Sequence, residues 1–261
     1  MEPLFPVPRV TESFIDGIIK DLGWHRYEEL MHLKAGRKNA DYIGPNAVLE
    51  LKLIEKEGIL EPGRQDKVAK IFDRSSDGKT EIDIDLDSVD VSFREAIEEI
   101  ISKPLQGPLK KASAQIKDTR ADLNAVRHAG ILIVVNNGYS YLTHENFCKL
   151  IIDRVRRDSS QIDYAFCITP SCHQGGLGIV VHFQADCLAR QEIGSNKWTH
   201  EVAFREKLMD RYGDAMTAMM RDQLNPEFWD NRLDPIRDIV FEREGIRYIR
   251  RAPGVPDSQF R

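Results

Sequence analysis

The chain has 261 residues, of which 41% are hydrophobic and 30% are charged, and this balance is typical of a soluble globular protein rather than a disordered one. The formal net charge of -5 excludes a chain that is basic throughout, although basic residues can still gather on one face. The sequence contains no run of about 20 apolar residues that could cross a bilayer, and its N-terminus has no signal-peptide pattern. We therefore expect a cytoplasmic protein without membrane association.

The first predicted element is a helix that Thr11 or Ser13 caps and that Gly23 ends. Its apolar residues recur at helical spacing and form one stripe, consisting of Phe14, Ile15, Ile18, Ile19 and Leu22. Glu12 lies in the first turn, where a carboxylate is favoured by the helix dipole. This helix is therefore expected to pack one face on a core.

Residues 39–54 predict two short strands joined by a turn at 44–46. In the second strand Leu49, Leu51 and Leu53 alternate with Val48, Glu50 and Lys52, so the leucines face a core and a carboxylate and an amine share the opposite face. Val48 and Ile54 at either end of that pair indicate that the polar face is itself partly covered.

A half-covered Glu50 beside Lys52, with Asp41 on the preceding strand, is unfavourable unless the charges are paired or hold a metal. Asp41, Glu50 and the carbonyl of Leu51 supply the oxygen ligands that Mg²⁺ prefers, and Lys52 could orient water or neutralise charge on a phosphate. The alternative is a solvated strand face that carries an ordinary ion pair.

Residues 55–102 are interpreted as an insertion with a helix over 63–73, an alternating strand over 81–86 and a helix near 92–102. A long amphipathic helix then starts at Pro104. Its predicted buried stripe comprises Leu105, Leu109, Ala112, Ile116, Thr119, Leu123 and Val126. Next to that stripe lie Lys111 and Gln115, and the helix is basic overall through Lys103, Lys110, Lys117, Arg120 and Arg127.

The β-branched apolar run at 129–135 predicts a strand buried on both faces. A helix from Thr143 and strands over 162–169 and 178–183 follow, and residues 191–261 are expected to form a mostly helical extension that packs on the core or makes a dimer surface. A zinc site could be assembled from Cys167, Cys172, His173, His182 and Cys187, but their spacing fits no short Cys-x-x-Cys knuckle. Core packing of Cys167 and Cys187 is the simpler interpretation.

Asp41 followed by Glu50-Leu51-Lys52 resembles the signature of the PD-(D/E)xK nuclease superfamily, with Ala40 in place of the usual proline. The order of predicted elements over about 11–136 is close to the αβββαβ core of the restriction endonuclease-like fold. The resemblance implies an α/β protein with a mixed central sheet, in which residues 1–190 form the nuclease core.

The same resemblance implies a Mg²⁺-dependent endonuclease, with Mn²⁺ as a substitute, that cleaves DNA, most simply double-stranded, as a possible homodimer. Asp41, Glu50 and Leu51 would hold the metal, assisted by Glu12 on the first helix, and Lys52 would position water. Gln115 would contact the substrate strand. Two alternatives stay open: a catalytically silent nuclease-like domain that binds nucleic acid or a protein partner, and an unrelated α/β enzyme.

Overall fold

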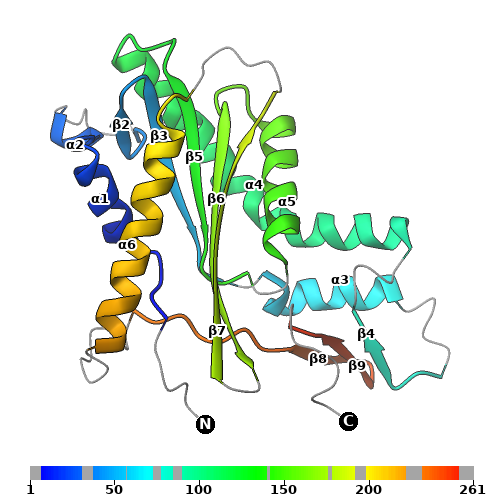
Figure 1. Cartoon of the computed structure of the whole chain (residues 1–261). Coiled ribbons are helices and arrows are strands. Elements are labelled where there is room, and N and C mark those ends of the chain that lie inside the picture. Colours follow the sequence, from blue (N-terminus) through cyan, green and yellow to red (C-terminus); the bar gives the residue numbers. More distant parts are fainter. Residues whose placement is uncertain are drawn as a thin grey trace.

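A mixed six-stranded sheet forms the centre of the molecule in the computed structural model (Figure 1). The structure describes residues 7–30, 38–56, 58–72, 78–84, 90–139, 142–175, 178–191, 198–221 and 231–252. The strand order is β1-β2-β3-β5-β6-β7, with bounds β1 (His25–Arg26), β2 (Tyr42–Gly44), β3 (Ala47–Ile54), β5 (Ala129–Asn136), β6 (Tyr164–Gly175) and β7 (Gly178–Ala189). The inner pairs β3–β5 and β5–β6 are parallel and the outer pairs are antiparallel, so the predicted α/β class with a mixed sheet is confirmed.

Helices cover both faces of this sheet (Figure 1). They are α1 (Glu12–Asp21), α2 (Tyr27–Leu30), α3 (Pro62–Phe72), α4 (Val91–Asp122), α5 (His144–Asp158) and α6 (Glu201–Arg221), with a 3-10 turn η1 (Gly58–Leu60). The apolar faces of α1 and α6 pack on one side of the sheet, and those of α4 and α5 pack on the other. No helix in the described ranges is both long and apolar enough to cross a membrane.

The predicted first helix and hairpin are confirmed in detail. Thr11 caps α1 by accepting a hydrogen bond from the backbone N–H of Phe14 at 3.2 Å, and Gly23 takes a positive φ of 67° just after the helix. In the β2–β3 hairpin Tyr42 lies opposite Leu49, and Asn46 supplies the left-handed conformation that the turn needs. Local sequence signals thus determine the elements around the predicted site.

Helix α4 is longer than predicted, because residues 91–122 form one helix rather than two. Pro104 and Pro108 lie inside it, and its ribbon changes direction between the two halves (Figure 1), as expected where proline removes hydrogen bonds. The separate helix start at Pro104 is therefore wrong. Val126, predicted in the buried stripe, lies beyond the helix end and is 75% exposed.

A second, three-stranded sheet joins two parts of the chain that are far apart in sequence. Strand β4 (Glu81–Asp83) pairs in parallel with β9 (Ile246–Arg250), which forms a hairpin with β8 (Ile239–Arg243). The expectation of a mostly helical extension holds for α6 and is wrong for this hairpin. Ile239 and Phe241 are buried against the α3 and α4 side of the core, whereas Trp229 lies outside the described residues.

The second half of the main sheet follows the predicted order. Strand β5 is buried along its whole length, and Thr143 caps α5 by accepting a hydrogen bond from Asn146 N–H at 3.2 Å. Strands β6 and β7 are longer than the predicted segments and form an antiparallel hairpin. Gly130 in β5 must be glycine, since a Cβ there would lie 2.1 Å from the backbone oxygen of Gln161.

Candidate active site

Asp41 lies immediately before β2, at the point where that short strand stops covering β3. Its backbone oxygen accepts a hydrogen bond from Tyr27 N–H at 2.9 Å, and its side-chain Oδ2 accepts one from Leu51 N–H at 2.8 Å. The Asp41 carboxylate thus replaces the backbone partner that β2 no longer provides to β3. One backbone and one side-chain hydrogen bond thus fix Asp41 at the edge of β3.

The second half of β3 has a sheet neighbour only on the β5 side, among the described strands. The N–H and C=O of one residue point to the same side of a strand, so the Leu51 carbonyl faces the same edge as its N–H, toward Asp41. The predicted third oxygen donor therefore shares an edge with the first.

Glu50 projects from the face of β3 that packs against α4, and its side chain is 0% exposed. Its Oε1 accepts a hydrogen bond from the ammonium of Lys52, which is 21% exposed. Its Oε2 is buried without a hydrogen-bond partner in the described part of the chain. The predicted pairing of Glu50 and Lys52 on one face is confirmed, and the burial is more complete than the sequence indicated.

Both carboxylates are unfavourable in their charged forms. The pKa of Glu50 is raised to about 8, chiefly by burial and next by the negative charge of Asp41, while the positive charge of Lys52 opposes the rise. Burial also raises the pKa of Asp41, while the hydrogen bond from Leu51 and the charge of Lys52 lower it. The two acids therefore carry an electrostatic cost that a cation would relieve.

Helix α4 holds the residues that precede Asp41. The buried Thr119 accepts a hydrogen bond from Ala40 N–H at 2.8 Å, and Gln115 Nε2 donates to the backbone oxygen of Asn39 at 2.9 Å. Gln115, which was predicted to contact substrate, thus holds the backbone two residues before Asp41 in this structure. Its contact with a substrate strand stays a prediction.

Glu12 lies near the site, where its charge contributes to the raised pKa of Asp41. It is more than half exposed and forms an ion pair with Arg26, which also bonds Asp16 at 2.8 Å. Arg26 therefore neutralises the α1 acids in this structure. A role of Glu12 in metal binding stays a prediction.

The donor set fits a small divalent cation. The carboxylates of Asp41 and Glu50 and the Leu51 carbonyl are all oxygen donors, and Glu50 contributes a buried oxygen that lacks a hydrogen bond. Such an orphaned carboxylate oxygen costs free energy unless a cation or proton satisfies it. The fit rests on this orphaned oxygen and on the raised pKa values.

The basic character of α4 is reduced at one predicted position. Arg120 is buried and forms an ion pair with Asp163, and it also donates to the backbone oxygen of Gln161 at 3.0 Å. Its charge therefore holds α4 to the start of β6. Lys103, Lys110, Lys111 and Lys117 remain exposed along the helix.

Comparisons with protein-family models, with curated proteins and with solved structures found no match.

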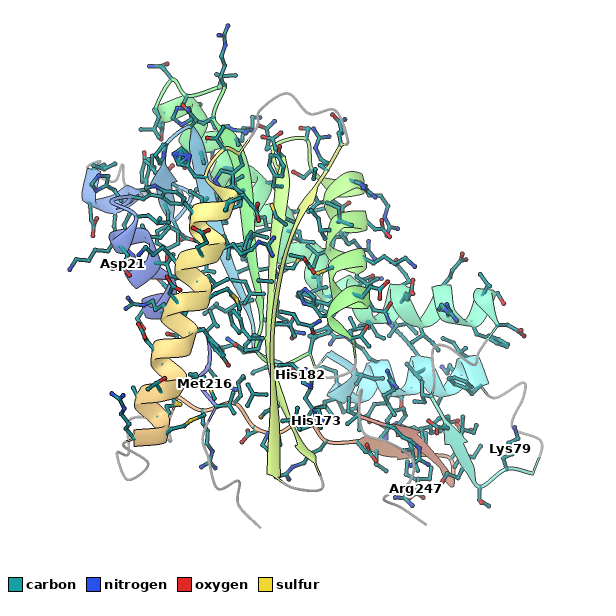
Figure 2. All side chains as sticks on the ribbon, in the orientation of Figure 1. Asp21, Lys79, His173, His182, Met216 and Arg247 are labelled. Carbon is teal, nitrogen blue, oxygen red and sulfur yellow. The ribbon has the colours of Figure 1, made fainter. Side chains whose placement is uncertain are left out.

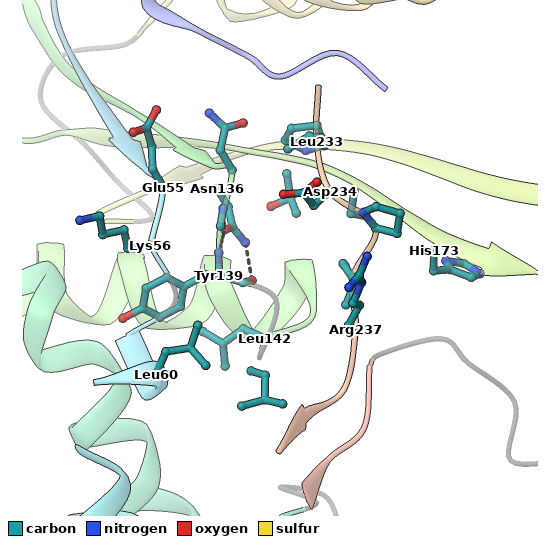
Figure 3. Close-up of a pocket in the computed structure, with 18 of the residues that line it drawn as sticks. Glu55, Lys56, Leu60, Asn136, Tyr139, Leu142, His173, Leu233, Asp234 and Arg237 are labelled. Carbon is teal, nitrogen blue, oxygen red and sulfur yellow. Dashed lines mark hydrogen bonds between the residues drawn. The ribbon is translucent and has the colours of Figure 1, made fainter. Parts of the chain in front are cut away.

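A cavity of about 1090 Å³ lies at the carboxyl ends of β3 and β5 and beside the middle of the β6–β7 hairpin, and the sequence did not indicate it. Figure 3 shows Tyr139 on one side of it and Asp234, Arg237 and His173 on the other. Neither Asp41, Glu50 nor Lys52 lines this cavity. The predicted site and the cavity are therefore separate features.

One further group of side chains of the types that ligate metals comes together in the described part of the chain. The donor atoms of His144, Cys148 and Asp186 all lie within 4.8 Å of one another. The residues that the sequence offered for a zinc site are different. Two of them, His173 and His182, lie in the β6–β7 hairpin (Figure 2), where their rings stack with centroids 5.1 Å apart. The missed signal was the four-residue spacing of His144 and Cys148 on a predicted helix.

Proposed function

We propose that the protein is a Mg²⁺-dependent nuclease that hydrolyses phosphodiester bonds in DNA, with Mn²⁺ as a substitute metal. The observation that carries the proposal is the edge of β3, where Asp41 bonds the N–H of Leu51 and the buried Glu50 pairs with Lys52. The element order also supports it. The chain runs α1-β1-α2-β2-β3-η1-α3-β4-α4-β5, which follows the αβββαβ order expected of a PD-(D/E)xK nuclease when the short α2 and the inserted η1, α3 and β4 are set aside.

In this proposal Asp41, Glu50 and the Leu51 carbonyl hold the metal. A bound Mg²⁺ would supply Lewis-acid stabilisation of the charge on the phosphate and a water of lowered pKa. Lys52, which reaches the same face as Glu50, orients the attacking water and offsets negative charge that develops on the phosphate. Thr119 and Gln115 keep Asp41 in place through the backbone of Ala40 and Asn39.

The test is a cleavage assay with plasmid and single-stranded DNA in the presence of Mg²⁺, Mn²⁺ or EDTA, read on a gel. We expect metal-dependent nicking or linearisation that Asp41→Asn and Lys52→Ala abolish. Lys56→Ala is the matched control, because Lys56 is an exposed lysine just past the end of β3. Cleavage that persists in EDTA or in the Lys52→Ala variant would overturn the proposal.

The complete burial of Glu50 favours one alternative, a nuclease-like domain that binds nucleic acid or a protein partner without cutting. Such a domain keeps the Glu50–Lys52 pair as a structural contact. Isothermal titration with Mg²⁺ separates the two, since only the nuclease requires metal binding that Asp41→Asn removes. A homodimer, which cleavage of both strands would favour, is tested by sedimentation of the protein bound to duplex DNA.

A further inference from the structure

The group formed by His144, Cys148 and Asp186 joins α5 to the edge strand β7. His144 and Cys148 lie four residues apart on one face of α5, and Asp186 projects toward them from β7. The Nε2 atom of His144 lies 3.4 Å from Cys148 Sγ and 3.0 Å from Asp186 Oδ2. One nitrogen, one sulfur and one carboxylate oxygen thus converge on a common point.

We propose that this group binds a zinc ion through Cys148 Sγ, His144 Nε2 and the Asp186 carboxylate. These three donor types are the ones that zinc takes from proteins, and a thiolate favours zinc over Mg²⁺, which prefers oxygen donors. The inference is independent of the proposed nuclease function, because no residue is shared with the Asp41 site.

The surroundings of His144 orient its ring for metal binding. Nδ1 lies 2.8 Å from the hydroxyl of Thr169, which is buried. When Nδ1–H donates to that hydroxyl, Nε2 has no proton and directs its lone pair at Cys148 and Asp186. Metal-binding histidines are commonly held in this way by an acceptor on the other ring nitrogen.

The charges of the group also suit a divalent ion. A Cys148 thiolate and an Asp186 carboxylate together balance the two positive charges of zinc, so the site is neutral within a mostly apolar layer. Arg205 of α6 approaches Asp186 from the Oδ1 side, where its Nη1 lies 4.0 Å from the carboxylate oxygen. It therefore leaves the Oδ2 side of the carboxylate facing His144.

The site is accessible from one side. Cys148 and His144 are each 6% exposed, whereas the Asp186 side chain is 59% exposed, and His144 and Thr169 line the large cavity. Three protein ligands leave a fourth position of a tetrahedral zinc ion for water or a small ligand, as in zinc sites that do chemistry rather than purely structural ones. The site also ties α5 to a strand that has no sheet neighbour on its other side among the described strands.

Cobalt(II) in place of zinc provides the direct test, because a cobalt–thiolate bond gives a charge-transfer band in the near ultraviolet. The full-length protein, stripped with a chelator, is titrated with Co²⁺ and then with Zn²⁺ as a competitor. We expect a thiolate band that saturates when about one Co²⁺ per chain has bound at this group, and loss of the band when Zn²⁺ displaces the Co²⁺. A metal bound only by the oxygens of the Asp41 site cannot produce that band.

Variants assign the ligands. Cys148→Ser should remove the band, and Asp186→Asn, at a largely exposed position that folding tolerates, should weaken Zn²⁺ binding by at least about 10- to 100-fold. Cys187→Ser is the matched control, since Cys187 neighbours Asp186 in sequence but packs on the opposite face of the sheet. No thiolate band in the wild-type protein, or a band and affinity unchanged in both ligand variants, would overturn the proposal.

Discussion

The substitution Glu50→Gln is expected to remove a pH-dependent loss of stability from the protein. The pKa of Glu50 is raised from 4.5 to about 8, chiefly by burial, so the folded state holds a proton at this site that the unfolded state has already released. Between these two values the unfolded state binds fewer protons, and the free energy of unfolding therefore falls as pH rises. Glutamine has the same shape and no charge, so the free energy of unfolding of the Glu50→Gln variant should not fall with pH in this way.

The expected size follows from the burial of the carboxylate. Each pKa unit corresponds to about 1.4 kcal/mol, so ionisation of folded Glu50 costs several kcal/mol by about pH 9. Glu50→Gln avoids this cost, but glutamine cannot form an ion pair with Lys52, which offsets part of the gain in stability. We therefore expect the variant to be more stable than the wild type by about 2 kcal/mol at this pH. For a chain of this size that corresponds to an increase in Tm of about 4 to 8 °C at high pH.

Thermal unfolding of both proteins in EDTA, followed by circular dichroism at about pH 5 and about pH 9, measures the difference. The wild-type Tm should fall relative to the variant as pH rises. Glu55→Gln, at an exposed position directly after β3, is the control and should follow the wild-type curve. Parallel curves for wild type and Glu50→Gln would refute the argument that a buried, partly unsatisfied carboxylate controls this slope.

Two other contacts of α4 give predictions that chemical denaturation and the DNA assay can check. Thr119→Val leaves the N–H of Ala40 without its partner, so we expect the free energy of unfolding to fall by about 1 to 3 kcal/mol. Cleavage should also slow, because Asp41 loses support. Unchanged cleavage would show that Thr119 does not position Asp41. Arg120→Ala removes the cation from the mostly buried Asp163, which keeps its hydrogen bond from the Gly130 N–H, and should cost about 3 to 5 kcal/mol of the free energy of unfolding. A cost below about 1 kcal/mol would show that the ion pair is solvated.

Much of the site could be predicted from the sequence because it depends on alternation and turn chemistry. The spacing of Glu50 and Lys52 places them on one face of β3 in any regular strand, and the turn at 44–46 brings Asp41 to that strand. The full burial of Glu50 and the bond from Gln115 to Asn39 depend on how α4 packs, and α4 is distant in sequence. Such long-range packing leaves no local pattern.

Two predictions from the sequence, the helix start at Pro104 and the mostly helical C-terminal part, were wrong for identifiable physical reasons. Proline at 104 resembled a helix start, where its missing N–H costs nothing, but α4 continues through it because packing on both halves outweighs the lost hydrogen bond. The β8–β9 hairpin did carry a signal, since Glu244 and Gly245 form a two-residue turn with positive φ at both positions. Together with the apolar and polar residues that alternate on either side of it, this turn would have indicated two strands.

The parallel pairing of β4 with β9 constrains how the chain is made. During synthesis β4 emerges long before β9, and Ile82 and Phe72 can be fully covered only when β9 is present. A ribosome-bound chain that stops short of residue 246 would expose this apolar surface and an unpaired strand edge, which are features that chaperones and proteases recognise. The small sheet therefore makes the burial of Ile82 and Phe72 depend on residues 246–250, so this corner of the core forms only after β9 has been synthesised.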